Sequence, residues 1–362
     1  MRRHSPLLAL LVASLPGCGG STGPFPSPTP TPVHPVEAVV FYDENGNGLQ
    51  DGNEAAVVPG AEVTISGRSG QSAPGTGHVT VSNVPDGTAT ASLTNSLPPF
   101  YGPGAPVEIS VPLPEGEIVR LGAVLPIGSN VPARYMAFGD SITDGDGSSS
   151  GYGYRRLLEN RLRAHFGDGE VVNQSEGGTR SNEGADRISR SLRRIDPAYT
   201  LVLYGTNDWN ADECRNVPGP PCFTVDSLRR IVRSIKATRS LPVVGTIIPV
   251  NTGSDPRVPE SRNVWVRDVD ELIAAMVEEE GGVVADLYGP FMEVPDFHTL
   301  FYDHVHPNDA GYEIIANGFF EAITTPRAAS SQPSSVGDGE FAPPPEIVMP
   351  RRPPSSRGPF RR

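Results

Sequence analysis

Two short segments contain the residue types of a nucleophilic catalytic centre. In MAFGDSITDGDG, residues 136–147, an apolar run ends in Gly-Asp-Ser, and Ser141 begins the polar part. In FYDHVHPNDAGYEII, Asp303 and His306 are three positions apart. A serine becomes a nucleophile when a histidine takes its proton and a carboxylate orients that histidine. The alternatives are a turn serine that caps a helix, an aspartate that caps the next helix, and a surface histidine.

Few histidines could serve as the base. Of the seven in the chain, three lie in its N-terminal third, outside the region that contains Ser141. His165 falls in a helical pattern and His298 in a predicted loop. His304 and His306 both lie in the segment around Asp303, and His304 is the rival base.

Two further segments could supply hydrogen-bond donors. NQSEGGTRS, residues 173–181, follows a predicted strand, and its glycines allow a backbone N–H to approach a ligand closely. In LVLYGTNDWN, Asn207 follows another predicted strand. Ligands bind at the carboxyl ends of strands in open parallel sheets. The alternative for both segments is an ordinary turn, because Gly, Asn and Asp are turn residues.

The elements that would position these residues alternate between strand and helix from about residue 131 to 325. The predicted strands are the apolar runs YMAF, VVN, LVLY, VVGTIIPV and VVADLY. Helical spacing of apolar residues marks two helices, through Leu228, Ile231, Val232 and Ile235, and through Val269, Leu272, Ile273 and Met276. Continuously apolar strands that alternate with helices predict an α/β fold with a parallel sheet covered on both faces.

Along residues 131–325 the four segments follow one another in the order GDS, Gly-rich turn, GTND and DxxH. In this order they resemble the SGNH-hydrolase superfamily of GDSL-type esterases and lipases. The resemblance implies a three-layer, flavodoxin-like parallel sheet. It also implies a role for five residues: Ser141 as nucleophile, His306 as base, Asp303 as the residue that orients it, and Gly178 N–H and the Asn207 amide as oxyanion donors. The adjacent Gly177 leaves the register of the oxyanion glycine open by one residue, although the spacing from Asn173 favours Gly178.

The activity that the resemblance implies is carboxylic ester hydrolysis without a catalytic cofactor. The predicted export and the small β-domain favour the interpretation that the substrates are short-acyl esters such as O-acetylated carbohydrates. A lysophospholipase- or thioesterase-type lipid hydrolase is the alternative within the family. A non-catalytic surface-binding protein is the alternative outside it.

Residues 37–127 show short β-rich runs separated by turn residues, which predicts a small all-β sandwich. Its first turn, DENGNGLQDGNE, fits a calcium-loop template with oxygen ligands at alternate positions and a glycine at the sixth. It resembles the calcium loops of dockerins and of B-type repeats in bacterial surface proteins. The predicted ligands are Asp43, Asn45, Asn47, Leu49 through its carbonyl, Asp51 and Glu54. The alternative is an Asn/Gly-rich turn without an ion.

The ends of the chain predict export and anchoring. Residues 1–17 have a charged start and a short apolar run, and resemble a bacterial lipoprotein signal with Cys18 as the lipidated residue. Residues 18–36 are a Pro/Ser/Thr-rich linker, and the tail over 327–362 is predicted to be disordered. We therefore expect a protein anchored to the bacterial cell envelope by lipid, either in the periplasm or at the surface. In that oxidising compartment, Cys214 and Cys222 are expected to form a disulfide.

The charge balance argues against a nucleic-acid partner. The chain has 42 Asp and Glu against 29 Lys and Arg, a formal net charge of -13. Binding to nucleic acid depends on a basic surface that neutralises phosphates. The expected partners are a small ester or acetylated glycan and, through Cys18, a membrane.

Overall fold

A computed structural model describes residues 31–215 and 222–326 of the chain. From Val33 onward, the described residues belong to one compact unit. The predicted signal, Cys18, most of the linker and the predicted tail over 327–362 lie outside the described residues. The division into a β-domain over 37–127 and a hydrolase domain over 131–325 stays a prediction.

The N-terminal region is built from two four-stranded sheets, ordered β4-β1-β8-β6 and β3-β2-β5-β7. The strands are β1 (Val33–Tyr42), β2 (Glu62–Ile65), β3 (Arg68–Gln71), β4 (His78–Pro85), β5 (Gly87–Leu93), β6 (Gly102–Pro103), β7 (Val107–Val111) and β8 (Val119–Val124). Alternate residues are buried in several of these strands, such as Val79 and Val81 in β4, whereas residues 38–42 of β1 are all buried. These strands contribute apolar side chains to the core, and β3 and β6 contribute no buried residue.

The sequence did not predict two of these strands. In β3, RSGQ has no apolar alternation, and three of its four residues are exposed. β6 is only two residues long and contains a proline. Such short strands with little burial belong to sheet edges, where local hydrophobic pattern gives no signal.

The second region is a five-stranded parallel sheet in the order β10-β9-β11-β12-β13. Its strands are β9 (Val131–Gly139), β10 (Glu170–Ser175), β11 (Pro197–Leu203), β12 (Leu241–Gly245) and β13 (Val283–Ala285). The helices are α1 (Ser141–Asp144), α2 (Tyr154–Phe166), α3 (Ser181–Ile195), α4 (Asp212–Arg215), α5 (Thr224–Ala237), α6 (Ser261–Glu279), α7 (Tyr288–Met292) and α8 (Asp309–Thr324). Two 3-10 helices, η1 (Asp208–Asn210) and η2 (Phe297–Leu300), complete it.

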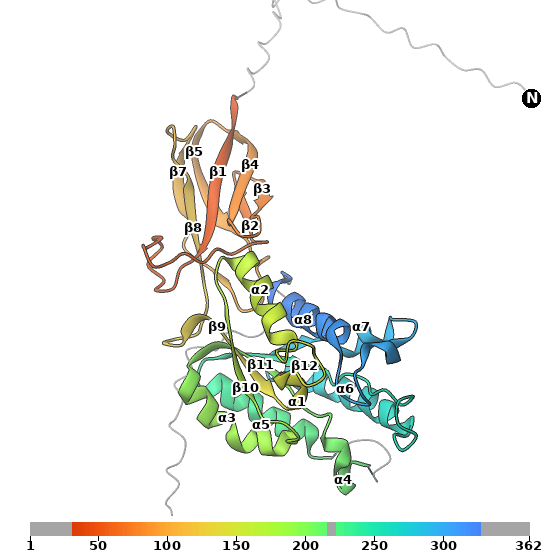
Figure 1. Cartoon of the computed structure of the whole chain (residues 1–362). Helices are drawn as coiled ribbons and strands as arrows, with labels where there is room; N and C mark the ends of the chain where they lie inside the picture. Colours follow the sequence, from red (N-terminus) through yellow and green to blue (C-terminus); the bar gives the residue numbers. More distant parts are fainter. Residues whose placement is uncertain (1–30, 216–221, 327–362) are drawn as a thin grey trace, which may run out of the picture. The chain divides into compact units, whose positions relative to one another are not determined.

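Helices cover both faces of this sheet. Figure 1 shows α2 beside α8, and α3 beside α5. Successive residues of β9 alternate between the two cores: Ala137 is buried with residues of α2 and α8, whereas Met136 and Phe138 are buried with residues of α3, α5 and α6. The predicted three-layer, flavodoxin-like parallel sheet is thereby confirmed, and a strand-rich region precedes it, whereas the small all-β sandwich domain stays a prediction.

The strand order places three strand ends together. β9 lies between β10 and β11, so the chain crosses to opposite sides of β9 in its first two crossovers. This reversal is the topological switch point at which open α/β sheets bind ligands. Gly139, the last residue of β9, must be glycine because a Cβ there would lie 2.4 Å from the Leu203 carbonyl oxygen in β11.

Two local expectations were wrong. Leu272 in α6 was expected to follow the apolar pattern but is 40% exposed, because its neighbours Val269, Ile273 and Met276 already fill the face against the sheet. His298 lies in η2 rather than in an irregular loop. No helix among the described residues has the length and apolar character that crossing a membrane requires.

Candidate active site

Ser141 is held at the sheet edge by a tight turn. It is the first residue of α1, directly after β9 and Asp140. The Asp140 side chain accepts the Ile142 N–H at 3.0 Å and so caps this helix. Ser141 Oγ lies 2.9 Å from His306 Nε2. The serine and the predicted base are therefore within hydrogen-bond reach, although 165 residues separate them in the sequence.

A turn built by Asp303 orients His306. Asp303 Oδ1 accepts the backbone N–H groups of Val305 and His306, both at 2.8 Å, and Oδ2 lies 2.7 Å from His306 Nδ1. A carboxylate only accepts, so Nδ1 carries the proton and the Nε2 lone pair faces Ser141. Burial raises the pKa of the Asp303 carboxyl, but the His306 ring and the two backbone N–H groups outweigh it and hold this pKa below its usual value. Asp303 therefore stays ionised beside the imidazole.

The two histidines of this segment have different contacts. His306 contacts both Ser141 and Asp303. The His304 backbone carbonyl instead accepts the Asn251 N–H at 2.9 Å. The spacing alone did not separate them, because both follow Asp303 closely.

Three backbone N–H groups at Ser141 and in the turn after β10 are free to bind an oxyanion. Over residues 31–215 and 222–326, the N–H groups of Ser141, Gly177 and Gly178 have no hydrogen-bond acceptor, so the choice between the two glycines stays a prediction. Gly178 has a φ of +75°, a backbone conformation that favours glycine. The neighbouring Gly177 faces the nucleophile, since a Cβ on it would lie 3.9 Å from Ser141 Cβ. The turn after β10 therefore lies against the serine.

The side-chain amide of Asn207 lies between the turns that follow β9 and β10. It follows β11 and precedes η1. Its Nδ2 donates to the Thr179 carbonyl at 3.0 Å and to Asp140 Oδ2 at 3.2 Å. The amide thus bridges the turns that carry Ser141 and Gly178. The longer of the two bonds, to Asp140, is the one that an oxyanion could share.

Comparison with protein families agrees with this geometry. Residues 137–314 match the model of the GDSL-like lipase/acylhydrolase family. This part of the chain is similar to that family. The enzyme class predicted from the sequence, a carboxylic ester hydrolase, is the class of the GDSL family.

Individual relatives are more distant. The thioesterase 1/protease 1/lysophospholipase L1 of Escherichia coli K12 is 29% identical over 120 residues, which are 33% of this chain and 53% of that protein. The matched part thus spans about half the length of this curated relative. An alpha/beta hydrolase from the metagenome of Lake Arreo is 22% identical, with a TM-score of 0.45 over 55% of this chain and 98% of that one. An acetyl xylan esterase from Geobacillus stearothermophilus is 19% identical, with a TM-score of 0.45 and the same coverage.

Three residues that support the candidate site were not assigned a role from the sequence. Asp140 caps α1 and accepts from Asn207. Buried Asp208 accepts from Ser181 N–H and Oγ and from Thr224 Oγ1, which ties the starts of α3 and α5 to the segment of Asn207. Asp140 and Asp208 stand inside the motifs GDS and GTND, so position beside a candidate residue was the only signal for them.

Arg187 is the third supporting residue. Its guanidinium donates to the carbonyls of Gln174 and Gly139, each at 2.9 Å, and lies 4.2 Å from the centre of the Phe138 ring. It therefore fixes the ends of β9 and β10 relative to each other. No local pattern singles this arginine out, because its partners, which also include the Tyr204 hydroxyl and the Glu176 carboxylate, are not its neighbours in the sequence.

Cys214 and Cys222 are joined by a disulfide, with a Cα–Cα distance of 4.8 Å. Both cysteines are buried, and residues 216–221 between them lie outside the described residues. The bond closes the excursion that follows the GTND segment.

The buried carboxyl of Asp140 makes stability depend on pH. Burial raises the pKa of Asp140 to about 7, against the opposing hydrogen bond from Ile142 N–H. Because the folded chain then binds this proton more tightly than the unfolded chain, the stabilisation is present below about pH 4 and is lost as pH rises through about 7. Asp140→Asn removes this titration. We expect the melting temperature of the wild type to fall relative to Asp140→Asn between pH 5 and pH 8, measured by thermal denaturation. Parallel curves for the two proteins would contradict it.

Proposed function

We propose that the protein is a serine esterase in which Ser141, His306 and Asp303 form the catalytic triad. The observation that carries the proposal is the continuous chain from Asp303 Oδ2 through the His306 ring to Ser141 Oγ, with contacts of 2.7 and 2.9 Å. This arrangement lets the histidine take the hydroxyl proton while the carboxylate stabilises the resulting imidazolium.

The reaction proceeds in two acyl-transfer steps. Ser141 Oγ bonds to the carbonyl carbon, and its proton passes to His306 Nε2. The oxyanion that forms is held by Ser141 N–H, Gly178 N–H and the Asn207 amide. The bond to the alcohol oxygen then breaks, and His306 returns the proton to that oxygen. Water attacks the acyl-enzyme in the same way, which releases the carboxylic acid and restores Ser141.

The surroundings of Ser141 support a small, polar substrate. Asp146, Glu176, Gly177, Gly178 and Tyr302 are exposed around it. Within the part of the chain that the structure describes, Tyr152 and Tyr302 are the only exposed large apolar side chains in these loops. A long acyl chain needs an apolar groove, whereas polar groups and a flat aromatic ring suit a sugar. We therefore propose short-acyl esters of carbohydrates, such as acetylated glycans, as substrates.

A lipid-ester hydrolase is the second candidate. Its support is the similarity of 120 residues to a protein named for thioesterase and lysophospholipase activities. A non-catalytic binding protein is less well supported, because all five predicted residues lie at one edge of the sheet.

The deciding experiment compares p-nitrophenyl acetate with p-nitrophenyl octanoate as substrates of the same protein. Acetate release is then measured from a per-O-acetylated sugar. Preference for the acetyl ester and release from the sugar are expected. A higher kcat/KM for octanoate would favour the lipid-ester hydrolase. No turnover of either ester by folded protein would favour the binding protein.

We further propose that the loop over 43–54 binds a structural calcium ion, remote from catalysis. Asp43 and Glu54 are each 2% exposed, and within the described ranges no lysine, arginine or histidine pairs with them. Their oxygens accept backbone N–H groups of the loop instead. Two buried carboxylates without a counter-charge are costly, so a divalent cation here would be favourable.

The other predicted calcium ligands are rich in oxygen atoms, and three of them are hydrogen-bonded to one another. Asn45 and Asn47 both donate to Asp51 Oδ2, at 2.8 and 3.0 Å. In the described part of the chain, no three His, Cys, Asp or Glu side chains converge as a metal site. The proposal therefore depends on amide and carbonyl oxygens of Asn45, Asn47 and Leu49, the ligand types that calcium accepts.

Calcium is expected to raise the melting temperature of the protein by about 5 °C when it is present well above its Kd. Chelation with EDTA should reverse the shift, and Asp51→Asn should reduce it. Glu278→Gln, which removes an exposed carboxylate from α6, is the matched control and should keep it. A melting temperature that calcium leaves unchanged would refute the site.

The cellular location is proposed on the sequence alone. We propose that Cys18 is lipidated after removal of residues 1–17 and anchors the protein to the cell envelope. The acidic net charge and the exposed carboxylates around Ser141 also favour an uncharged or cationic partner over nucleic acid.

A further inference from the structure

Asp146 occupies a fixed position beside the proposed base. Its N–H donates to the Ser141 carbonyl at 3.1 Å, and its own carbonyl accepts the Tyr312 hydroxyl at 2.6 Å. Its Oδ2 lies 4.0 Å from His306 Nε2. The side chain is 57% exposed, so this carboxylate is open to solvent and to a substrate.

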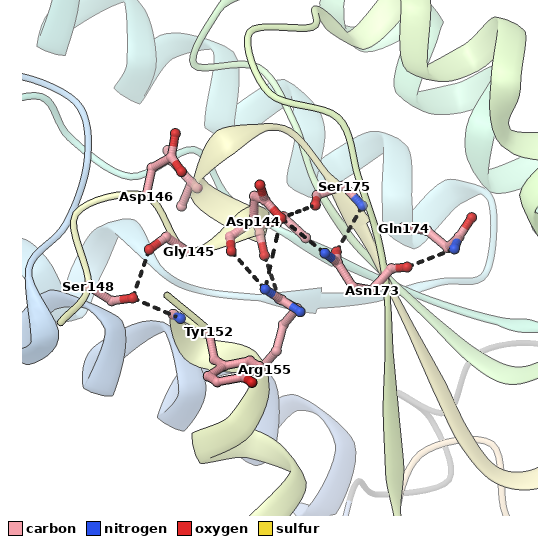
Figure 2. A network of polar contacts seen from close by, with 12 residues as sticks. Asp144, Gly145, Asp146, Ser148, Tyr152, Arg155, Asn173, Gln174 and Ser175 are labelled. Carbon is pink, nitrogen blue, oxygen red and sulfur yellow. Dashed lines mark hydrogen bonds and ion pairs between the residues drawn. The ribbon is translucent and has the colours of Figure 1, made fainter. Parts of the chain in front are cut away.

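The neighbouring Asp144 shows what a structural carboxylate looks like in the same turn. Its Oδ1 accepts from Asn173 Nδ2 at 3.0 Å and from Ser175 Oγ at 2.8 Å, and it lies 3.9 Å from Arg155. Figure 2 shows this network, in which Asp146 has no dashed line to any other residue drawn. Asp144 is thus committed to holding the loops together, whereas the Asp146 carboxylate is free to contact a ligand.

The reaction itself places the alcohol part of the ester next to Asp146. His306 Nε2 must reach the leaving oxygen to return the proton. That oxygen therefore lies about 3 Å from Nε2. Since Asp146 Oδ2 is 4.0 Å from the same nitrogen, hydroxyl or ammonium groups on the adjacent carbons of the alcohol come within hydrogen-bond reach of it.

Tyr302 packs against Gly147, the residue that follows Asp146. Gly147 packs so closely that a Cβ on it would lie 2.9 Å from Tyr302 Cβ and 3.2 Å from His306 Cβ. The Tyr302 N–H donates to the His306 carbonyl at 2.8 Å, which fixes the backbone of this residue. Its side chain is 73% exposed. An exposed aromatic ring attracts cations and provides a flat apolar surface.

We propose that Asp146 and Tyr302 bind the alcohol part of the ester and select a cationic alcohol, such as an amino sugar, over an anionic one, such as a sugar phosphate. The inference rests on the proposed esterase function. The free carboxylate attracts a cation and repels an anion, and the ring adds attraction for the cation alone. Asp146 and Tyr302 are thus specificity residues for the leaving group, separate from the triad.

Other charges near the site leave this selection in place. Asp144 and Glu176 are also acidic. The neighbouring Arg155 and Arg187 donate to backbone carbonyls and lie within 4.0 Å of these two carboxylates. The two pairs therefore cancel in net charge, so they leave the Asp146 carboxylate, 4.0 Å from His306 Nε2, without a paired cation among the described residues.

The test uses three acetate esters of one phenol frame: phenyl acetate, its 3-trimethylammonio derivative and its 3-sulfonato derivative. Each variant is compared with wild type on the same ester, so that differences in intrinsic reactivity cancel. Asp146→Asn should lower kcat/KM for the cationic ester about three- to ten-fold and raise that for the anionic ester by a similar factor. The neutral ester should change less than either. High salt should reduce the discrimination of the wild type.

Controls separate the possible causes. Asp186→Asn removes an exposed carboxylate of α3 that pairs with Arg230 of α5. It matches the change in net charge and should leave the variant-to-wild-type ratio of kcat/KM unchanged for all three esters. Tyr302→Ala should lower kcat/KM for the cationic ester, and Tyr302→Phe should retain it. An equal change of Asp146→Asn on all three esters would overturn the inference, because it would place the effect on His306. Failure of the wild type to cleave phenyl acetate would instead refute the esterase function and this inference with it.

Discussion

Ser141→Ala is expected to lower kcat for p-nitrophenyl acetate by at least about 10⁴-fold, the effect of removing a nucleophile from a serine hydrolase triad. Among the residues that the structure describes, the only side-chain hydrogen bond of Ser141 joins it to His306, so the variant should fold and melt like the wild type. A fluorophosphonate should label the wild type by forming a bond to Ser141 Oγ with loss of fluoride. The mass of the intact protein, measured before and after labelling, reports this directly.

The matched control is Ser149→Ala. Ser149 follows Ser141 by eight residues and is exposed; alanine keeps its backbone N–H bond to Asp309 and removes only the hydroxyl, which interacts with the same exposed carboxylate. It should retain both turnover and labelling. His306→Ala should lose activity as severely as Ser141→Ala, because members of a triad act as a unit. His304→Ala should retain it. Turnover in Ser141→Ala close to that of wild type would contradict the assignment of the nucleophile.

The sequence was informative where a residue's neighbours along the chain determine its environment. The helical spacing of Leu228, Ile231 and Ile235 predicted the buried face of α5, and all three are buried. The spacing of Asp303 and His306 predicted a turn that joins their side chains, and this contact is present at 2.7 Å. In each case the geometry is local, since the partners lie within one or a few turns of the chain.

Long-range pairings were not accessible in the same way. Arg187 fixes two strand ends through backbone carbonyls, which carry no residue identity. Asp146 resembles Asp144 in the sequence, and only the fold shows that one is bound by Asn173 and Ser175 while the other faces His306. Strand β3 was missed because it lies at a sheet edge and buries little. Residues that act through distant backbone or through exposure therefore require the three-dimensional structure.

Asn207→Ala is expected to lower kcat by about 10²- to 10³-fold with little change in KM, because the oxyanion that the amide stabilises exists only in the transition state. In the resting structure both Nδ2 hydrogens are engaged, at 3.0 Å to the Thr179 carbonyl and at 3.2 Å to Asp140 Oδ2. These bonds hold the amide in place before substrate binds. The substrate oxyanion then competes with Asp140 for the more weakly held hydrogen.

Asn210→Ala is the matched control for this variant. Asn210 is an exposed asparagine at the end of η1, and its carbonyl rather than its side chain accepts from Arg215. It should leave kcat unchanged. Steady-state kinetics on p-nitrophenyl acetate, with melting temperatures for both variants, separate an effect on the transition state from an effect on folding. A rise in KM at constant kcat would show that Asn207 binds the ground state instead, and the oxyanion would then depend on the N–H groups of Ser141 and Gly178 alone.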